Sequence, residues 1–407
     1  MFSVKNYKKY ILLFLFICFF YCFSSAQFAE KCPEHEYILK DISELETYNH
    51  NSNLENFFVK LNNNSEKINI VHIGASHVQA GYWTFGMRTL FEEKFDKKNT
   101  SLGLVFPYNI AKNNNCPYYY EFSHEGKWEI SKITDSQPKN NIGIMGITAS
   151  TNDSVAKLSF KINKRIKIEN YKFNKITIFH NAEDTNYVLN LSSNILIGIK
   201  NKENNATTFF LNDNISDFDL TITKKDALLA TTFLFYGALL ENTESDFMFF
   251  GIGVNGASTN SYLKANFLFD QLSLLKPNLV IFSIGINDAV SSIFTEEVYF
   301  KNYNQLIDSI LHINPECAII LTTNNDFYNY KGKWNPNQDS VASVMCRLSD
   351  KFDLSVWDMY KIMGGEKSIN KWRDDKLAQK DRIHFTKDGY FLLANLFFEA
   401  LTKQYNF

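Results

Sequence analysis

The chain of 407 residues contains a serine, a histidine and an acidic residue at positions where the three side chains can meet. Ser76 directly follows the apolar run 68–73 and a Gly-Ala pair, so its hydroxyl can project from a turn. His384 can accept the Ser76 proton, and Asp381, three residues earlier, can fix the tautomer of that histidine. Together these residues indicate nucleophilic catalysis by a serine.

Two further segments, at Gly256 and Asn287, carry groups that can stabilise an oxyanion. Gly256 follows the apolar run 247–254, and a glycine there lets the backbone approach a ligand closely. Asn287 follows the apolar run 278–284, and its side-chain amide can donate a hydrogen bond. Each residue alone is explained by a turn, a helix cap or a surface pair. The joint occurrence of all four segments at strand ends or loops favours a catalytic site.

The elements around these residues alternate between buried strands and amphipathic helices. This alternation predicts a parallel sheet covered on both faces, whose ligands bind beyond the carboxyl ends of the strands. We expect strands over 68–73, 247–254, 278–284, 318–323 and 354–357. We expect helices near 53–61, after Ser76, and near 296–313, 338–352 and 387–403.

The stretch 112–245 has a different pattern, in which apolar and polar residues alternate over many short runs. Leu158, Phe160 and Ile162 show the pattern, and Ile166 and Ile168 continue the alternation. Such alternation predicts antiparallel strands with one wet face, in a sandwich or jelly roll. Similar runs occur near 176–178, 187–191, 195–199 and 218–222. Because the α/β pattern stops near 110 and resumes near 246, the β module is an insertion.

The four catalytic segments resemble, in chain order, the motif blocks of the SGNH/GDSL hydrolases, which are esterases. Residues 70–79 resemble the Gly-Asp-Ser block, and 253–257 the glycine block. Residues 285–288 resemble the Gly-x-Asn-Asp block, and 381–384 the Asp-x-x-His block. A β insertion between the first two blocks is similar to the arrangement in bacterial peptidoglycan O-acetylesterases, in which a carbohydrate-binding-module-like domain is inserted.

The resemblance implies a role for each site residue. Ser76 would be the nucleophile, His384 the base and Asp381 the group that orients it. The N–H groups of Ser76 and Gly256 and the amide of Asn287 would form the oxyanion hole. The implied fold is a flavodoxin-like, three-layer α/β sandwich with a parallel sheet, interrupted by the antiparallel β domain. No cofactor and no metal ion is expected.

One residue, Ala75, departs from the family pattern, since an aspartate usually stands before the serine. That carboxylate braces neighbouring loops and is not the nucleophile, the base or an oxyanion donor, so its loss should loosen the site without removing a chemical step. We expect a secreted esterase that removes O-acetyl groups from a cell-envelope or extracellular polysaccharide. Two alternatives remain: a catalytically weakened glycan-binding protein and an acyltransferase on the same fold.

The first 26 residues have the pattern of a secretory signal peptide. Three lysines precede the apolar run 11–23, and small residues precede a cleavage point after Ala26. An uncleaved anchor is the alternative, although 13 apolar residues are short for a bilayer. Export would place the protein in the periplasm, at the cell surface or in the medium. The predicted domains are a signal peptide at 1–26, a lead-in at 27–66, a hydrolase domain at 67–111 and 246–407, and the insertion at 112–245.

Charge and cysteine content limit the partners. The chain has 42 Lys and Arg against 44 Asp and Glu, a near-balance that argues against nucleic-acid binding. Without the three lysines of the leader the net charge becomes −5, which suits a neutral glycan ester better than a polyanion. No membrane span is expected after signal cleavage. Buried free thiols and disulfides both remain open for Cys32, Cys116, Cys317 and Cys346.

Overall fold

The computed structural model describes residues 35–403 and 405, apart from 48–50, 64–65 and 113–114. The predicted signal peptide and Cys32 lie outside these described residues. Tyr37–Phe407 forms one compact unit. In the part of the chain that the structure describes, no helix is both long and apolar enough to cross a membrane.

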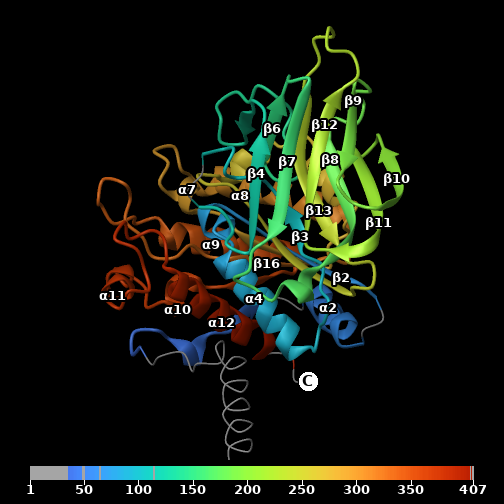
Figure 1. Cartoon of the computed structure of the whole chain (residues 1–407). Helices are drawn as coiled ribbons and strands as arrows, with labels where there is room; N and C mark the ends of the chain where they lie inside the picture. Colours follow the sequence, from blue (N-terminus) through green and yellow to red (C-terminus); the bar gives the residue numbers. More distant parts are fainter. Residues whose placement is uncertain (1–34, 48–50, 64–65, 113–114, 404, 406–407) are drawn as a thin grey trace, which may run out of the picture. The chain divides into compact units, whose positions relative to one another are not determined.

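A six-stranded sheet forms the centre of the α/β domain, with the strand order β1-β17-β16-β15-β2-β14 (Figure 1). The five predicted apolar runs are confirmed as strands, and all five are parallel. The short strand β1 pairs antiparallel with β17 at the sheet edge. The strands are β1 (Leu45–Thr47), β2 (Ile68–Gly74), β14 (Phe247–Gly253), β15 (Leu279–Ser283), β16 (Ala318–Thr322) and β17 (Ser355–Trp357).

Helices cover both faces of this sheet. On one face, Phe91 of α4 contacts Phe249 of β14. On the other face, Tyr303 of α8 contacts Phe282 of β15. Phe282 and Ile252 both align with Ile73 of β2, so Phe282 lies on the face opposite to Phe249. Every residue of β2 and β16 is buried, as a sheet covered on both sides requires. The predicted three-layer α/β fold is confirmed.

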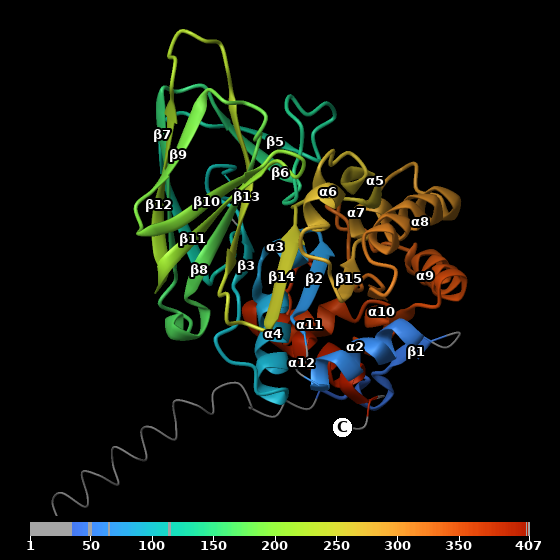
Figure 2. The ribbon, with the colours of Figure 1, turned by 90° about the vertical axis from the view of Figure 1, so that its right-hand side faces the viewer.

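The predicted helices are confirmed, and several short ones follow the strand ends. The pairs α4 with α12 and α8 with α9 pack against each other, the second pair beyond β15 (Figure 2). The helices are α2 (Ser52–Asn63), α3 (Ser76–Gln79), α4 (Tyr82–Lys94), α5 (Thr259–Tyr262), α6 (Leu268–Leu272), α7 (Ile286–Ala289), α8 (Glu296–Ile313), α9 (Gln338–Phe352), α10 (Met359–Ile362), α11 (Ile369–Asp374) and α12 (Lys387–Lys403).

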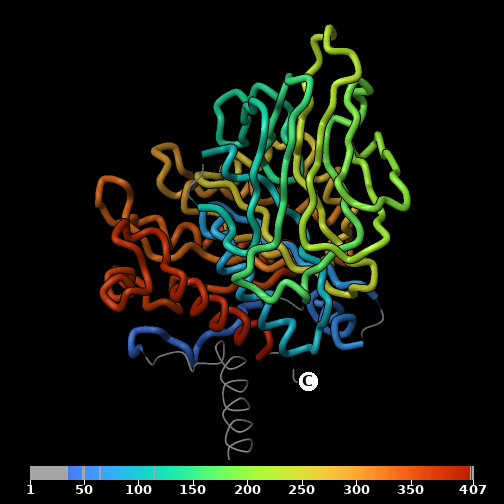
Figure 3. The backbone as a smooth tube through the Cα atoms, in the orientation of Figure 1, coloured from blue at the N-terminus to red at the C-terminus, as the bar shows by residue number. Residues whose placement is uncertain are grey.

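Two antiparallel sheets make up the β domain, as the alternating pattern predicts. One has the order β10-β11-β8-β13-β6-β5 with β3 also on β13, and the other has the order β4-β7-β12-β9. Figure 3 lets the chain be followed from α4 into these sheets and back to β14. The strands are β3 (Gly103–Val105), β4 (Tyr120–Glu125), β5 (Glu129–Lys132), β6 (Ile147–Thr151), β7 (Val155–Ile162), β8 (Phe173–His180), β9 (Tyr187–Leu191), β10 (Ile195–Asn201), β11 (Ala206–Ile215), β12 (Asp217–Lys224) and β13 (Phe233–Glu241).

The expectation that Ile166 and Ile168 continue the strand was wrong. Strand β7 ends at Ile162, and Asn163 then forms a turn: its side-chain oxygen accepts the N–H of Arg165, and its carbonyl accepts that of Ile166. A 3-10 helix follows at Ile168–Tyr171. An asparagine that bonds its own following backbone ends a strand in this way.

The two domains share one hydrophobic core. A continuous cluster of buried side chains runs from Val71 and Val280 of the parallel sheet to Phe160 and Ile178 of the antiparallel sheets. Strand β3 lies within the range predicted for the hydrolase domain, yet it pairs with β13 of the β domain. The exact domain boundaries stay a prediction.

The described cysteines form no disulfide. Cys116 is exposed, Cys317 is buried and Cys346 is half-buried, and each is a free thiol. Burial raises the pKa of the Cys317 thiol, which suits a packing role.

Candidate active site

Strand register brings the candidate residues to one edge of the parallel sheet. Gly74 at the end of β2 lies between Gly253 of β14 and Ser283 of β15. The chain segments that follow these three positions therefore start side by side, beyond the carboxyl ends of the strands. Ser76 is the first residue of α3, and Asn287 lies in α7.

The structure brings Ser76, His384 and Asp381 into one hydrogen-bonded chain. His384 Nε2 lies 2.8 Å from Ser76 Oγ, and His384 Nδ1 lies 2.7 Å from Asp381 Oδ2. The other carboxylate oxygen of Asp381 accepts the backbone N–H of Ile383 at 2.9 Å and that of His384 at 3.0 Å. This is the geometry in which a serine hydroxyl can pass its proton to a histidine whose tautomer is fixed.

Asp381 is held as a carboxylate. Burial acts to raise its pKa, but the hydrogen bonds from the side chain and backbone of His384 and from the backbone of Ile383 outweigh burial and lower the pKa to about 2. Three donors to the charged form produce such a shift. A negative charge next to His384 therefore persists throughout the neutral range, and it favours the protonated imidazole that forms during catalysis.

His77, next to the serine, is a buried neighbour of His384. Its Nδ1 lies 2.9 Å from the hydroxyl of Tyr390, and its ring centroid lies 5.3 Å from that of His384. Burial first, and then the nearby His384, lower the pKa of His77 to about 3. His77 is therefore neutral at ordinary pH, and it packs against the catalytic ring without adding a charge to it.

Two residues that the sequence did not single out hold the serine turn in place. Asn115 Nδ2 donates to the Ser76 carbonyl at 2.9 Å. Gln79 Nε2 donates to the Asn115 carbonyl at 3.0 Å, while its Oε1 accepts the N–H of Asn255 at 2.8 Å. Gln79 thus ties α3 to the turn that contains Gly256. The position of Gln79, about one helical turn after Ser76, could have indicated that its side chain lies near the serine. Nothing in the sequence marks Asn115.

Asn287 lies close to Ser76, and the Gly256 turn is tied to Asn287. Asn287 and Ser76 line the same small cavity. One N–H of the Asn287 amide donates to the carbonyl of Ala257 at 2.9 Å, which leaves the second N–H of that amide free of this bond. Gly256 has a φ of 81°, a conformation that favours glycine. It does not line the cavity, so the structure connects it to Ser76 through its neighbours.

Asp288 locks the Asn287 segment to the helix that follows the Gly256 turn. Its carboxylate accepts the N–H of Thr259 at 3.1 Å and the hydroxyl of Thr259 at 2.6 Å. Burial raises the pKa of Asp288 to about 6, and the bonds from Thr259 offset only part of this effect. The two loops that carry the predicted oxyanion donors are therefore held together by one buried carboxylate.

Ala75 borders the cavity beside Ser76, where the family pattern has a carboxylate. Trp83 and Asn324 line the same cavity. Both are buried, and among the described residues Trp83 Nε1 and Asn324 Nδ2 have no hydrogen-bond partner. Two donors without an acceptor beside Ala75 are the structural consequence of the missing carboxylate.

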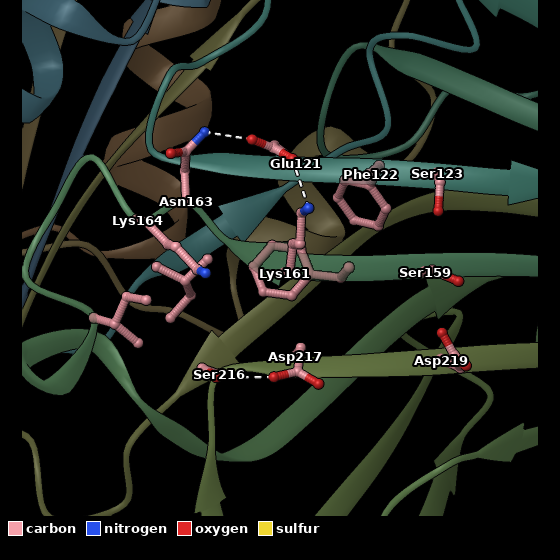
Figure 4. Close-up of a pocket in the computed structure, with 13 residues that line it drawn as sticks. Glu121, Phe122, Ser123, Ser159, Lys161, Asn163, Lys164, Ser216, Asp217 and Asp219 are labelled. Atoms are coloured by element: carbon pink, nitrogen blue, oxygen red, sulfur yellow. Dashed lines mark hydrogen bonds and ion pairs between the residues drawn. The ribbon is translucent and has the colours of Figure 1, made fainter.

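A second hollow lies on the outer face of the sheet β4-β7-β12-β9, in the β domain (Figure 4). Several of the charged groups at this hollow are bonded within the protein. Glu121 binds Lys161 at 2.9 Å and accepts from Asn163 at 2.6 Å, and Asp219 binds Lys157 at 2.7 Å. Among the residues that the structure describes, no group of three or more His, Cys, Asp or Glu could hold a metal ion.

Comparison with known proteins supports the assignment of this fold. Residues 228–392 match the model of the GDSL-like Lipase/Acylhydrolase family, a span that includes Gly256, Asn287, Asp381 and His384. Ser76 lies outside the match because the β domain separates it from the other blocks. No curated protein matches the sequence.

One solved structure shows the same fold over most of the chain. A peptidoglycan O-acetylesterase structure matches with a TM-score of 0.69 and 18% identity, over 88% of this chain and 98% of that one. An acetyl xylan esterase is 18% identical over 38% of this chain and 81% of that one, with a TM-score of 0.31. A GDSL-like lipase from Bacteroides thetaiotaomicron is 20% identical over 39% and 76%, with a TM-score of 0.30.

The fold is therefore a parallel α/β domain interrupted by an antiparallel β domain, and its segment 228–392 is similar to GDSL-like acylhydrolases. This match confirms the resemblance predicted from the motif blocks and indicates an ester hydrolase.

The close approach of β14 to α3 gives a first prediction. A Cβ atom on Gly253 would overlap the backbone of Gln79, so Gly253→Ala should displace α3 and Ser76 with it. We expect an ester-hydrolysis rate at least ~10-fold lower and a loss of about 1–3 kcal/mol of unfolding free energy. The matched control is Gly198→Ala, where a Cβ meets only Phe209 at 3.4 Å. Equal effects of both substitutions, in p-nitrophenyl acetate assays and thermal unfolding, would contradict this reading.

The buried Asp288 gives a second prediction. Its folded-state pKa of about 6 lies above the ordinary value of 3.8, so the folded protein binds more protons between these pH values and loses stability as the pH rises through them. Asp288→Asn removes this loss. The unfolding free energy of the variant minus that of the wild type should therefore rise by up to about 2–3 kcal/mol between pH 4 and pH 7.

Denaturant unfolding at several pH values measures this difference. The exposed substitution Asp270→Asn serves as control and should give a flat difference across the same range. A flat difference for Asp288→Asn would show that the pKa of Asp288 is the same in the folded protein and in the unfolded chain, which would contradict the prediction.

Proposed function

We propose that the protein is an exported serine esterase that removes O-acetyl groups from a cell-envelope or extracellular polysaccharide of the peptidoglycan type. The observation that carries the proposal is the bonded chain Ser76–His384–Asp381 at the carboxyl edge of the sheet. Similarity in fold to a peptidoglycan O-acetylesterase, over 88% of this chain and including a β domain, supports an acetylated glycan as substrate. The leader-like segment 1–26 supports export.

The first half-reaction forms an acyl-enzyme. Ser76 Oγ attacks the carbonyl carbon of the acetyl ester as its proton moves to His384 Nε2. Asp381, ionised because of its lowered pKa, stabilises the imidazolium through its bond to Nδ1. His384 then gives the proton to the sugar oxygen, which leaves as a hydroxyl, and the acetyl group remains on Ser76.

The second half-reaction releases acetate. A water molecule takes the place of the sugar, His384 accepts its proton, and the hydroxide attacks the acetyl carbonyl. Ser76 leaves with the proton returned by His384, and the free serine is restored. In both steps the oxyanion is bound by the N–H groups of Ser76 and Gly256 and by the amide of Asn287, whose remaining N–H is available.

Ala75 favours a second candidate, a glycan-binding protein whose hydrolase site has weakened. The two unpaired donors beside Ala75 show that the brace used by the family is missing. The bonded chain Ser76–His384–Asp381 is nevertheless complete, so we favour an active esterase.

Substitution of the catalytic groups tests the esterase directly. Ser76→Ala and His384→Ala should each lower acetate release from O-acetylated peptidoglycan and from p-nitrophenyl acetate by ~10³-fold or more, because each removes the nucleophile or its base. The exposed His312→Ala should behave as the wild type. A fluorophosphonate probe should label Ser76 alone. Purified protein that releases no acetate above the Ser76→Ala background on either substrate would refute the proposal.

Restoring the missing carboxylate distinguishes the two candidates. In an active esterase, Ala75→Asp should change kcat/KM on p-nitrophenyl acetate by less than ~10-fold, because no chemical group is missing. A gain of ~100-fold or more from a near-background rate would instead show that the natural site has decayed. Thermal unfolding of the variant shows whether the new carboxylate is accommodated.

A further inference from the structure

A hairpin between β16 and α9 lies directly against the segment that carries the catalytic pair. Tyr328 and Trp334 form the paired base of this hairpin, and Asn329 accepts backbone N–H groups from its tip. The N–H of Tyr328 donates to the carbonyl of Arg382, which lies between Asp381 and His384. The hairpin is therefore bonded directly to the chain segment that joins Asp381 to His384.

Arg382 is held in a fixed position by this hairpin. Its guanidinium carbon lies 3.8 Å from the centre of the Tyr328 ring, and the same group lies 3.5 Å from the place where Gly332 would carry a Cβ. Arg382 also has a φ of 57°, which is uncommon for a residue with a side chain. Backbone strain of this kind is tolerated where the surroundings fix the residue, and it concentrates at functional sites.

The positive charges at this place have no acidic partner. In the described part of the chain, no carboxylate forms an ion pair with Arg382 or with Lys331 and Lys333, the two exposed lysines that flank Gly332. In the hollow of the β domain, by contrast, Lys161 binds Glu121 (Figure 4), and nearby Lys157 binds Asp219. We call Arg382, Lys331 and Lys333 the cationic rim.

An aromatic ring accompanies the charges. Tyr330 lies at the tip of the hairpin between the lysine pair and Tyr328, and 81% of its surface is exposed. Exposed tyrosine is a common contact for other molecules because it gives a large, partly apolar area with few rotatable bonds. The rim therefore offers three cations that have no acidic partner among the described residues, together with an exposed ring, and its Arg382 directly follows Asp381 in the chain.

We propose that the cationic rim binds carboxylate groups of the substrate, and that the natural substrate is an acidic O-acetylated polysaccharide. This rests on the proposed esterase function and narrows it to glycans whose repeating units carry a carboxylate. Guanidinium and ammonium groups bind carboxylates through charge-assisted hydrogen bonds, and Arg382 is already oriented by its ring contact. The local charge thus opposes the overall acidic balance, which by itself suggested a neutral substrate.

Kinetics on two polymers test this proposal. The probes are O-acetylated polygalacturonate, which is acidic, and acetylated xylan, which is neutral. For the wild-type protein, kcat/KM on the acidic polymer should fall several-fold as the salt concentration increases, because salt screens the attraction between the rim and the carboxylates. The value of kcat/KM on the neutral polymer should not change with salt.

Two variants remove the rim charges. Arg382→Asn takes away the cation while keeping a residue that tolerates positive φ, and Lys331→Gln/Lys333→Gln removes the lysine pair. Each should lower the ratio of acidic-polymer to p-nitrophenyl acetate activity by ~10-fold or more, mainly through KM. The control, Lys60→Gln/Lys98→Gln, removes two cations from the ends of α2 and α4, near the amino edge of the sheet, and should leave the ratio unchanged.

A binding measurement separates this proposal from the esterase proposal. Polygalacturonate without acetyl groups should bind the wild-type protein at low salt and bind both rim variants at least ~10-fold more weakly. A protein that hydrolyses p-nitrophenyl acetate but shows no preference, no salt effect and no rim dependence would overturn the cationic rim alone. A protein without esterase activity that still binds polygalacturonate through the rim would overturn the esterase and keep the acidic ligand.

Discussion

The hydrogen bond between Ser76 and His384 joins residues 308 positions apart, and the geometry of the whole site depends on it. On the serine side, the position is set by β2, whose end is fixed between two neighbouring strands. On the histidine side, the segment is anchored by a short bridge between Ala378 and Phe385 and by the N–H of Gln379, which donates to the His384 carbonyl at 2.7 Å. Neither side alone can hold a hydroxyl and an imidazole at 2.8 Å.

The electrostatic surroundings of His384 are simple for a site with two adjacent histidines. Asp381 remains charged because three donors stabilise its carboxylate, and His77 remains neutral because it is buried against Tyr390. The catalytic ring therefore has one close negative charge, and the adjacent His77 ring adds no positive charge to it. Because neighbouring titratable groups have different surroundings, only one of them is suited to transfer the proton.

Local patterns in the sequence were sufficient to predict the parallel strands, the long helices, the alternating β domain and the meeting of Ser76 with His384. They failed where a single side chain ends an element or bridges distant segments. Strand β7 ends before Asn163 although the isoleucine pattern continues, because the side chain and the carbonyl of Asn163 accept backbone N–H groups that follow it. Asn115 was invisible because its contact with Ser76 is long-range and the chain is rich in asparagine. The placement of Arg382 beside Tyr328 likewise needed three-dimensional contacts.

The pairing of β14 with β2 also has a consequence for how the chain folds. These neighbouring strands are about 180 residues apart, and closing so long a loop costs conformational entropy before their contacts can form. A β domain that folds first would bring its two ends together and shorten that search. One hydrophobic cluster joins both domains, so the packing of the inserted domain also helps to hold β14 beside β2 in the folded protein. The nucleophile turn is thus stabilised by a module that contributes none of the three residues of the catalytic chain.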